Sequence, residues 1–575
     1  MELLLSVSNL SVEFKHGDAY HRAVQDVSFN VYRGRTLGIV GESGSGKSVS
    51  CMSLMHLLPS PPARIASGRA MLQEGDGCVE LMGMSEEEIR TIRGRRIAMI
   101  FQEPMTSLNP VQRCGDQVVE MLRLHETVDH DEARRRVIAL FEEVQLPRPE
   151  KIFESFPHEI SGGQKQRVMI AMALICHPDI IIADEPTTAL DVIAQKAILD
   201  LMREMQRRYN IGIIFITHDL GVMAQVADDL AVMYRGSIVE QGSAAQILAH
   251  PQHPYTQGLL ACRPPLDHRP DRLPTVADFL DPENPARQRR SNPTAAAPQT
   301  EKSLGSTSSA HQSDTPLIAV HDLCVDFPLK RNLFGKPTQI LHAVKSLTFD
   351  IHEGETLGLV GGSGCGKTTL GRTLLRLIEK TSGSILYRGQ PLDKLSSQEM
   401  RRLRSKLQII FQDPYSSLNP HLTVGQAIME PLIVHHRLGS DAERREAVLT
   451  LMQQVGLSAE HFDRYPHEFS GGQRQRVCIA RALILEPELV VCDESVSALD
   501  VSVQAQVLNL LSDLKQHYHY TYLFITHDLS VMHYMADRII VMQNGEIVEQ
   551  GATDQLFAHP QHPYTQQLVD AIPRI

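Results

Sequence analysis

The sequence predicts an α/β protein in which one large domain occurs twice, and two observations support this prediction. The first is a repeat of three segments at equal spacing: HEISGGQKQR (158–167) and HEFSGGQRQR (467–476), IFITHDL (214–220) and LFITHDL (523–529), and HPQHPYT at 250–256 and 559–565. The second is an alternation of apolar runs and helical patterns, which is typical of a mostly parallel sheet flanked by helices. Each copy is far longer than the roughly 20–50 residues of a solenoid unit, so each is expected to be a complete domain.

The elements of the first copy follow one another in a clear order. Residues 36–40 form a short apolar run before a glycine-rich loop, and a helix is expected to begin at Lys47. Residues 180–183 and 211–217 are further apolar runs of β type. Between them, apolar residues recur at helical spacing at Ile198, Leu201, Met202 and Met205. This order predicts strand, helix, strand, helix and strand in one sheet.

A change in composition separates the two copies. Residues 262–316 contain nine of the 32 prolines and show no helical or alternating apolar period. We therefore predict a first domain at 1–261, a flexible Pro/Ser/Ala-rich linker at 262–316 and a second domain at 317–575. Residues 257–282 leave a second possibility open, a small C-terminal extension of the first copy.

Composition excludes several classes of protein. With 575 residues, 42% hydrophobic and 22% charged, the chain is neither disordered throughout nor a collagen-like or coiled-coil rod. The net charge of −12 argues against a general nucleic-acid binder. Nine cysteines without a Cys-x-x-Cys pair argue against a disulfide scaffold and fit a reduced, cytosolic setting. The chain shows no signal peptide and no apolar run of the roughly 18–20 residues that span a membrane.

Each copy carries a glycine-rich loop suited to phosphates. Gly41–Ser48 and Gly361–Thr368 match G-x-x-x-x-G-K-[ST], and the first follows a predicted strand and opens a predicted helix. Glycines let backbone N–H groups surround phosphate oxygens, and the helix N-terminus adds favourable potential. Lys47 is expected to reach the β and γ phosphates, and Ser48 to offer its hydroxyl to Mg²⁺. A plain glycine-rich turn is the alternative, but two matches at equivalent places favour a nucleoside triphosphate site in each copy.

Two acids end a later apolar run in both copies. Asp184 and Glu185 follow residues 180–183, and Asp493 and Glu494 follow residues 489–492. The aspartates are expected to hold Mg²⁺, and the glutamates to orient and polarise the attacking water. The alternative is an exposed acidic turn.

A histidine and a glutamine complete each predicted site. His218 and His527 end apolar runs, and we expect them to contact the γ-phosphate, although a lone histidine is more often structural. Gln102 and Gln412 follow apolar runs and can bind Mg²⁺ or water without adding charge. A strand-end turn before a proline would explain each glutamine equally well in a single copy, and the duplication favours the functional interpretation.

The segments Ser161–Gln164 and Ser470–Gln473 each read Ser-Gly-Gly-Gln and precede a long predicted helix. A serine there is a helix N-cap, and two glycines leave backbone donors accessible. The segment is therefore either a helix cap alone or a second phosphate-binding surface. In the second case the two copies can close head to tail, each cap covering the γ-phosphate of the other.

These motifs together resemble the tandem ATP-binding cassette (ABC) ATPases, because all of them occur in order, twice. FQEPMTSLNP (101–110), FQDPYSSLNP (411–420) and the HPYT ends (253–256, 562–565) are similar to the oligopeptide/dipeptide/nickel importer branch. The resemblance implies two P-loop ABC nucleotide-binding domains in tandem. Each would have a mostly parallel core sheet, an antiparallel β subdomain and a helical subdomain.

The resemblance also implies a function. The chain would be the ATP- and Mg²⁺-dependent motor of an importer for glutathione or small peptides, at the cytoplasmic face of the bacterial inner membrane. It would act with two integral-membrane permease subunits and a periplasmic substrate-binding protein, as an intramolecular dimer, without nucleic acid and without an iron–sulfur cluster. The alternatives are an importer ATPase for other oligopeptides or microcin-type peptides, and a non-transport tandem ABC ATPase acting on ribosomes or DNA.

The resemblance assigns residues to two sites. Site one contains Gly41, Ser43, Gly44, Ser45, Gly46, Lys47, Ser48, Gln102, Asp184, Glu185 and His218, covered by Ser470, Gly471, Gly472 and Gln473. Site two contains Gly361, Ser363, Gly364, Cys365, Gly366, Lys367, Thr368, Gln412, Asp493, Glu494 and His527, covered by Ser161, Gly162, Gly163 and Gln164. The expected Mg²⁺ ligands are Ser48, Gln102 and Asp184 in site one, and Thr368, Gln412 and Asp493 in site two.

Some assignments stay open or depart from the family pattern. The aromatic residue that stacks on adenine could be Phe14 or Tyr20 in the first copy, and Phe327 or Phe334 in the second. Gly362 replaces the glutamate of the first copy, and Ser495 replaces the usual proline. Because neither change removes a phosphate or metal ligand, both sites are predicted to hydrolyse ATP.

Overall fold

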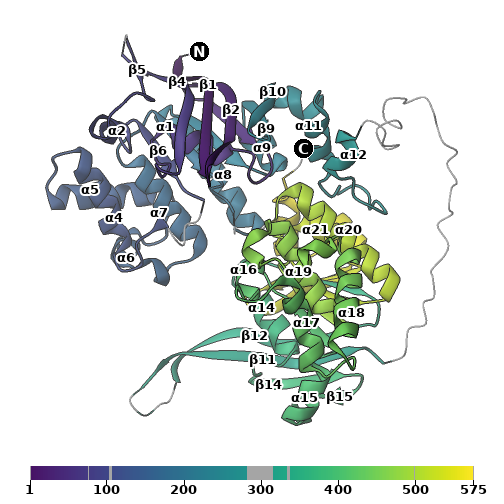
Figure 1. The fold of residues 1–575 in the computed structure, drawn as a ribbon. Coiled ribbons are helices and arrows are strands. Elements are labelled where there is room, and N and C mark those ends of the chain that lie inside the picture. The colour runs from purple at the N-terminus through teal and green to yellow at the C-terminus, as the bar shows by residue number, and fades with distance from the viewer. Residues whose placement is uncertain are drawn as a thin grey trace. The chain divides into compact units, whose positions relative to one another are not determined.

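The structure is a computed structural model that describes residues 2–573 except 76, 103–106, 189, 282–314, 333, 335, 336 and 498. The chain forms two compact units, and each contains one copy of the repeat (Figure 1). The first unit comprises Met1–Leu260, Phe279–Asp281 and Pro573–Ile575, and the second comprises Ala261–Asp278 and Pro282–Ile572.

A six-stranded, mostly parallel sheet forms the centre of the first copy, in the order β10-β9-β3-β8-β7-β6. Its strands are β3 (Thr36–Val40), β6 (Ile97–Ile100), β7 (Ile180–Asp184), β8 (Gly212–Thr217), β9 (Asp229–Tyr234) and β10 (Ser237–Ser243). Every residue of β3, β7 and β8 is buried, as expected for a sheet covered on both faces. The predicted strands at 36–40, 180–183 and 211–217 are therefore confirmed, with shifts of one residue at two ends.

A four-stranded antiparallel sheet accompanies the central sheet, in the order β2-β1-β4-β5. Its strands are β1 (Leu3–His16), β2 (Ala19–Tyr32), β4 (Ala63–Glu74) and β5 (Gly77–Glu80). Apolar residues of both sheets form one core with helix α1 (Lys47–Leu54), for example Leu10, Ile39, Leu54 and Ile182. The core thus fixes the loop between β3 and α1 from two sides.

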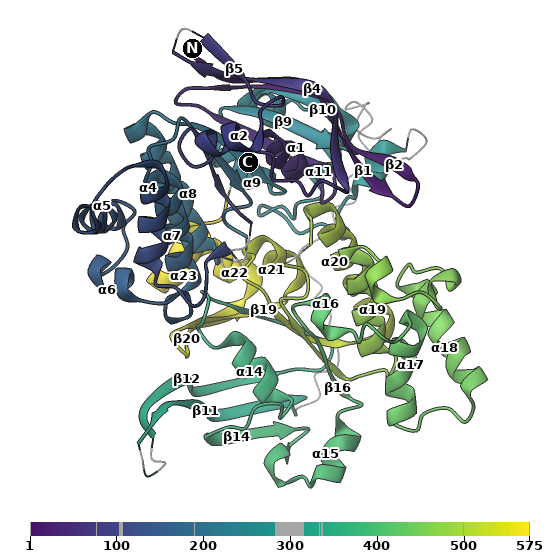
Figure 2. The ribbon, with the colours of Figure 1, turned by 60° about the vertical axis from the view of Figure 1, so that its left-hand side comes forward.

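The remaining helices of the first copy surround this core or form a separate group. They are α2 (Glu86–Ile92), α4 (Cys114–His125), α5 (His130–Glu143), α6 (Pro149–Glu154), α7 (Gly162–Leu174), α8 (Val192–Tyr209), α9 (Leu220–Val226), α10 (Ala244–Ala249) and α11 (Pro254–Ala261). Helices α4 to α7 contact one another and gather beside the sheets as a helical subdomain (Figures 1 and 2).

The second copy repeats this architecture. Its central sheet has the order β16-β17-β18-β13-β19-β20, and its antiparallel sheet has the order β12-β11-β14-β15. The strands are β11 (Ile318–Arg331), β12 (Pro337–Ile351), β13 (Thr356–Val360), β14 (Ser382–Tyr387), β15 (Gln390–Pro391), β16 (Leu407–Ile410), β17 (Leu489–Asp493), β18 (Thr521–Ile525), β19 (Arg538–Gln543) and β20 (Glu546–Ala552). The α/β fold class predicted from the repeat is confirmed in both copies.

Most helices of the second copy have counterparts in the first. They are α14 (Lys367–Leu374), α15 (Ser397–Leu403), α16 (Pro414–Ser417), α17 (Val424–Val434), α18 (Asp441–Gln454), α19 (Gly471–Leu483), α20 (Val501–Tyr518), α21 (Leu529–Met535), α22 (Thr553–Ala558) and α23 (Pro563–Asp570). Helices α17, α18 and α19 form the second helical subdomain (Figure 2). None of the described helices is both long and apolar enough to cross a lipid bilayer.

The structure differs from the predicted flexible linker at the linker's N-terminal end. Residues 262–281 are folded, and Ala261–Asp278 belong to the second unit rather than extending the first. Helix α12 (Val276–Leu280) lies in this stretch, and Leu273 and Val276 are buried. The prolines of this stretch disrupt the regular spacing of its apolar residues, but the stretch still packs against the folded protein. The rest of the predicted linker, 282–314, lies outside the described residues.

Candidate active sites

The predicted site residues of each copy meet at one edge of the central sheet. In the first copy, β3 pairs in parallel with β8, and β7 pairs in parallel with β6 and β8. The carboxyl ends of these strands therefore lie at the same edge, where ligands of parallel sheets bind. The glycine-rich loop follows β3, Glu185 follows β7, His218 follows β8, and Gln102 follows β6. The fold brings together groups that lie far apart in the sequence.

The glycine-rich loop of the first copy needs its glycines for two different reasons. Gly46 has a φ of 99°, a backbone conformation that residues other than glycine rarely adopt. A Cβ on Gly41 would lie 2.2 Å from the carbonyl oxygen of Met233, so the loop passes close to β9. Lys47 Nζ donates to the carbonyl oxygens of Gly41 at 2.7 Å and of Glu42 at 2.9 Å. The lysine is thereby held inside the curve of the loop.

The second copy has the same loop geometry. Gly366 has a φ of 102°. Lys367 Nζ donates to the carbonyl oxygens of Gly361 and Gly362 at 2.7 and 3.0 Å. The loss of a glutamate side chain at Gly362 therefore leaves the backbone acceptor in place.

A hydroxyl and a buried carboxylate lie side by side in each site. Ser48 Oγ donates to Asp184 at 2.8 Å, and Thr368 Oγ1 donates to Asp493 at 2.9 Å. Burial raises the pKa of both aspartates, because it disfavours the charged form more than the hydroxyl bond favours it. Among the described residues, Oδ2 of Asp493 is buried without a hydrogen-bond partner. A hard divalent cation such as Mg²⁺ would satisfy this oxygen set, so the residues fit the expected metal.

Glu185 is held in a strained backbone conformation. Its φ is 46°, in the left-handed region that residues with a Cβ rarely adopt, and its N–H donates to the carbonyl oxygen of Ile216 at 2.9 Å. Such strain gathers at functional sites, where the surrounding structure fixes it. The bond to β8 thus helps to direct the side chain toward its polar neighbours.

Three side chains contact the carboxylate of Glu185. Gln102 Nε2 donates to it at 3.0 Å, Thr188 Oγ1 donates at 3.0 Å, and His218 Nδ1 lies 3.2 Å away. Burial opposes ionisation, but the hydrogen bond and charge of His218, the Thr188 hydroxyl and Lys47 outweigh it and lower the pKa of Glu185 to about 2. The carboxylate is therefore ionised at neutral pH and able to accept a proton.

Glu494 is held in nearly the same way. It has a φ of 48°, and its N–H donates to the carbonyl oxygen of Ile525 at 2.9 Å. Gln412 Nε2 donates to the carboxylate at 2.7 Å, and His527 Nδ1 lies 3.6 Å away. Burial alone would raise the pKa of this glutamate, but the hydrogen bond and charge of His527 outweigh burial and lower the pKa. Both copies therefore contain an ionised carboxylate beside a phosphate loop.

Comparison with known proteins agrees with this geometry. A family model described as ABC transporter matches residues 24–188 and 344–497, one stretch in each copy. This chain belongs to the ABC transporter family. A second family model, described as the C-terminal region of oligopeptide/dipeptide transporters, matches residues 239–286 and 548–575. The chain is therefore an ATPase with two ABC cassettes.

Relatives of this ABC ATPase match over nearly its whole length. The glutathione import ATP-binding protein GsiA of Pectobacterium atrosepticum is 48% identical over 573 residues, which cover 99% of this chain and 89% of that protein. The protein of the same name from Salmonella choleraesuis is 47% identical over 577 residues, with the same coverage. Among solved structures, the dimeric ABC transporter cassette MJ0796 is 28% identical, covers 41% of this chain and 98% of that chain, and has a TM-score of 0.38.

The Ser-Gly-Gly-Gln segments of this ABC ATPase are helix caps. Ser161 caps α7, because its Oγ accepts from the N–H of Gln164 at 3.3 Å while Gln164 Oε1 accepts from the N–H of Ser161 at 2.9 Å. Ser470 and Gln473 form the same reciprocal pair at the start of α19. Gly162, Gly163, Gly471 and Gly472 are the first residues of these helices. Their role opposite the phosphate loop of the other copy remains a prediction.

Sequence reasoning missed two tyrosines that contact the phosphate loops. The N–H of Glu42 donates to the hydroxyl of Tyr255 at 3.0 Å, and the N–H of Gly362 donates to the hydroxyl of Tyr564 at 2.7 Å. Both tyrosines belong to the repeated HisProTyrThr segments. That repeat is the one signal in the sequence that could have found the tyrosines, but their contact with residues more than 200 positions away is visible only in the fold.

The aromatic candidates for adenine stacking separate into two groups. Phe14 and Phe327 pack against the cores of their copies, as a structural role requires. Tyr20 is 42% exposed and lies beneath the guanidinium of Arg64, 3.6 Å from its ring centroid. Phe334 is 89% exposed. The Phe334 ring is therefore exposed, whereas Arg64 covers one face of the Tyr20 ring.

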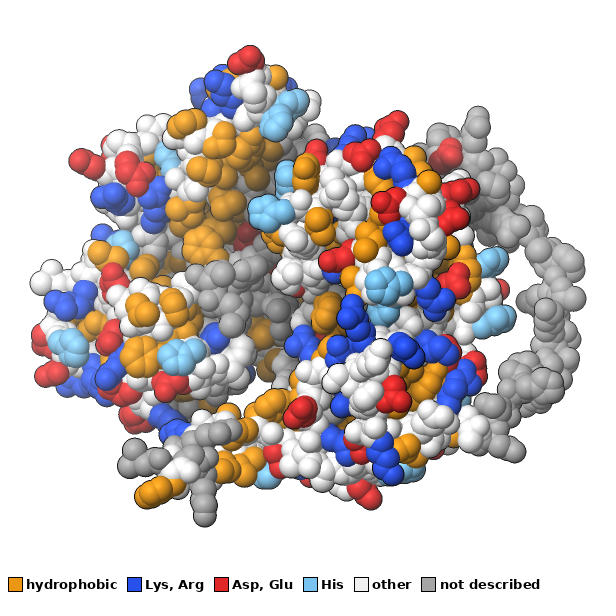
Figure 3. Space-filling model, turned by 60° about the horizontal axis from the view of Figure 1, so that its bottom comes forward, with side chains coloured by type: hydrophobic (Ala, Val, Ile, Leu, Met, Phe, Trp, Pro, Cys, Tyr) orange, Lys and Arg blue, Asp and Glu red, His pale blue; other side chains and the backbone are white. Residues whose placement is uncertain are grey.

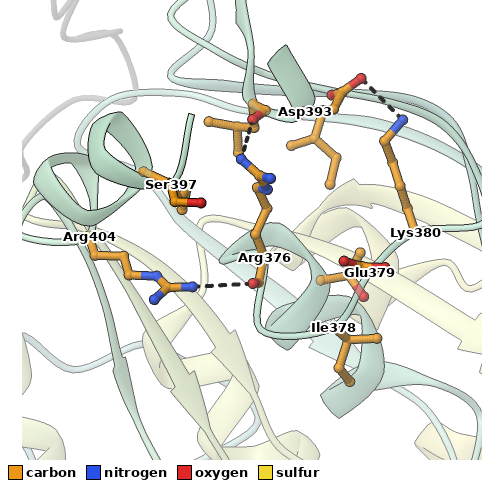
Figure 4. A pocket seen from close by; sticks show the side chains of 11 residues that line it. Arg376, Ile378, Glu379, Lys380, Asp393, Ser397 and Arg404 are labelled. Atoms are coloured by element: carbon orange, nitrogen blue, oxygen red, sulfur yellow. Dashed lines mark hydrogen bonds and ion pairs between the residues drawn. The ribbon is translucent and has the colours of Figure 1, made fainter. Parts of the chain in front are cut away.

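A cavity of about 440 Å³ in the second copy is separate from the ATP site (Figure 4). It lies at the C-terminal end of α14, whereas the phosphate loop lies at the N-terminal end. Its basic groups are already engaged: Arg376 donates to the carbonyl oxygens of Leu392 and Leu395, and Lys380 pairs with Asp393 at 3.3 Å (Figure 4). This cavity is therefore poorly suited to bind phosphate.

Proposed function

We propose that this ABC ATPase is the motor subunit of an importer for glutathione or other small peptides. The supporting observation is similarity over 99% of the chain to proteins named for glutathione import, together with the match of both C-terminal regions to oligopeptide/dipeptide transporters. Its partners would be two integral-membrane permease subunits, and a periplasmic protein would deliver the cargo to them. The chain would lie at the cytoplasmic face of the inner membrane.

Hydrolysis would use the contacts of Lys47 and Glu185. Backbone N–H groups of residues 41–48 and the ammonium of Lys47 would bind the phosphates of ATP. Glu185 would take a proton from water as that water attacks the γ-phosphorus, the bond to the bridging oxygen breaks and ADP leaves. Gln102 and His218 would hold Glu185 in place. Lys367, Glu494, Gln412 and His527 would do the same in site two.

Mg²⁺ would be held by Ser48 and Asp184 in site one, and by Thr368 and Asp493 in site two, with Gln102 and Gln412 as further ligands. When bound, the ion neutralises charge that develops on the phosphates. The 2.8 and 2.9 Å hydroxyl–carboxylate contacts support this assignment, because both oxygens already lie close together.

An intramolecular dimer would complete the two sites. Ser161–Gln164 would cover the γ-phosphate of site two, and Ser470–Gln473 would cover that of site one. The capped N-termini of α7 and α19 support this role, because the exposed residues Gly162 and Gly471 place their backbone at a positive helix end. ATP would then bind the two copies together, and hydrolysis would release them.

A groove beside Gln412 suits a membrane partner. A cavity of about 390 Å³ is lined by apolar groups such as Phe411 and Val434 and by polar groups such as Glu430 and Arg481. Phe411 and Val434 remain 38% and 42% exposed, which is typical of a surface that a partner covers. Since Gln412 directly follows Phe411, closure around ATP could be transmitted to a permease bound here.

The charge distribution agrees with this choice of partner. On the face shown in Figure 3, Lys and Arg side chains are interspersed with Asp and Glu side chains among the described residues. A nucleic-acid binder is expected to gather basic side chains in a patch or stripe. The visible face therefore favours a protein partner over nucleic acid.

The test is uptake of labelled glutathione into vesicles that contain this chain and its two permeases, with the binding protein supplied. We expect ATP-dependent uptake, and a loss of at least about 100-fold in ATP turnover with Glu185→Gln plus Glu494→Gln. The double variant should still bind ATP, because the amides keep the shape of the site.

Three results would contradict the proposal. Undiminished hydrolysis by the double variant would refute the assignment of the glutamates. Uptake of other oligopeptides with exclusion of glutathione would favour the first alternative cargo. Co-sedimentation with ribosomes and failure to bind any permease would favour a non-transport ATPase.

A further inference from the structure

Residues Ala261–Asp278, here called the strap, fold against the second copy although they begin at the last residue of α11, the helix that ends the repeat of the first copy. The main segment of the first unit, Met1–Leu260, ends directly before the strap begins. The strap is therefore a covalent continuation of the first copy that forms part of the second unit.

The centre of the strap is anchored by a buried side-chain amide. Asn509 on α20 accepts the N–H of Leu273 at 2.9 Å and donates to the carbonyl oxygen of Leu273 at 2.8 Å. The hydroxyl of Tyr534 on α21 donates to the same amide oxygen at 3.1 Å. Leu273 is 1% exposed and Asn509 is 2% exposed, so these bonds are shielded from water. A buried amide with both groups satisfied in this way specifies one partner segment.

Charged contacts flank this anchor. Arg269 donates to the carbonyl oxygen of Ala536 at 3.0 Å, and Arg272 pairs with Asp513 at 2.9 Å. The strap then ends in a capped helix start, where Thr275 donates through N–H and hydroxyl to Asp278 at 2.7 and 2.8 Å. Contacts to α20 and to the residue after α21 thus fix the strap at residues 269–273. The helix in which the strap ends is α12, labelled in Figure 1.

The equivalent surface of the first copy lacks this anchor. Helices α8 and α20 both contain 18 residues and follow an aspartate, so Asp200 corresponds to Asn509. Asp200 is exposed, and Gln225 on α9 corresponds to Tyr534. A carboxylate cannot donate to a backbone carbonyl. The surface that receives the strap is thus a property of the second copy.

We propose that the strap binds the α20/α21 surface of the second copy in every nucleotide state and keeps the two copies associated when no ATP joins them. The contact uses side chains of α20 and α21 and backbone groups of the strap, none of which belongs to the predicted phosphate or metal ligands. Its strength should therefore not depend on nucleotide or Mg²⁺.

The experiment uses the full chain with a protease site inserted at 291–300. After folding, the chain is cut, and association of the two halves is measured by analytical ultracentrifugation without nucleotide and with EDTA. The halves of the otherwise unaltered chain should remain associated. Asn509→Asp should weaken their association at least about tenfold, because the carboxylate would oppose the carbonyl of Leu273 and leave it without a donor.

The control is Asp200→Asn, the reverse exchange at the equivalent position, which should leave association unchanged. The first copy carries an exposed aspartate at that position, so a second copy with the Asn509→Asp substitution should fold once the strap leaves. If that variant is nevertheless unstable, Arg269→Ala with Arg272→Ala should still weaken association. Separation of the unaltered halves without nucleotide would overturn the proposal, and so would equal association of all these variants.

Discussion

The two ATP sites share most of their polar contacts but differ in charge beside the proposed metal-site aspartate. Helices α1 and α14 both contain eight residues and begin at the phosphate-loop lysine, so Met52 corresponds to Arg372. Arg372 Nη2 lies 3.8 Å from Oδ2 of Asp493. A guanidinium at this distance competes with a divalent cation for the carboxylate. Two sites with the same motifs are therefore expected to hold Mg²⁺ with different strength.

A second difference changes polarity without changing charge. Cys365 replaces Ser45 in the phosphate loop, and its sulfur lies 3.8 Å from Lys367 Nζ. Burial raises the pKa of Cys365 despite the nearby ammonium, so the thiol is neutral at physiological pH. The exchange of Ser45 for Cys365 thus adds no charge difference between the sites, unlike Arg372 and the replacement of Glu42 by Gly362.

At the mutated site itself, the largest expected effect comes from removing one proposed catalytic glutamate at a time. With both sites hydrolysing, each of Glu185→Gln and Glu494→Gln should leave about half of the turnover, since loss of a general base typically costs about 10²–10⁴-fold at its own site. If Arg372 slows site two, Glu494→Gln should retain the larger share. Phosphate release at saturating ATP and Mg²⁺ measures both. Complete loss in either single variant would show that the sites act as one unit.

The next effect concerns the tyrosines that contact the phosphate loops. Tyr255→Phe and Tyr564→Phe each remove the acceptor of a loop N–H, and leaving such a group unsatisfied costs about 1–3 kcal/mol. ATP should therefore bind about fivefold or more weakly at the corresponding site, measured with a fluorescent ATP analogue. Tyr234→Phe, which keeps the ring that packs against Tyr255, is the control. Equal binding in all variants would refute a role for the hydroxyls.

The smallest effect tests the charge difference directly. Arg372→Met should strengthen divalent-cation binding at site two by about three- to tenfold, because a partly exposed charge is screened by solvent. Met52→Arg should weaken binding at site one by a similar factor. Mn²⁺ binding followed by electron paramagnetic resonance in the presence of ATP gives the affinities without relying on turnover. No shift in either variant, or shifts in the reverse of these directions, would contradict a role for Arg372 in the difference between the sites.

Much of each site follows from local sequence patterns. Residues 36–40 and Lys47 begin the strand and helix that sequence reasoning predicted, because a run buried on both faces and a phosphate-binding loop have strong local signals. Asp184, Glu185 and His218 could be placed at one sheet edge because parallel strands share their carboxyl ends. Because each motif occurs in both copies, even a motif that is weak alone favours the functional interpretation.

Other features depend on contacts that no local pattern reports. The left-handed backbone of Glu185 and Glu494 is imposed by bonds to neighbouring strands, because glutamate does not itself prefer it. The bond between Leu273 and Asn509 joins residues 236 positions apart. Leu273 lies in a proline-rich stretch that the sequence predicted to be a flexible linker. A segment without periodic apolar residues can still pack, and the spacing of its apolar residues does not reveal this.

The difference between Asn509 and Asp200 has a consequence for the order of the two copies along the chain. If the halves were exchanged so that the present second copy came first, the strap would end the chain, and no linker would run on from it to the copy that carries the α20/α21 surface. A strap that followed the leading copy would then have to bind the surface that contains Asp200, and the carboxylate of Asp200 cannot donate to a backbone carbonyl. The two copies are alike in fold but not interchangeable in sequence order, and a circular permutant would test this directionality.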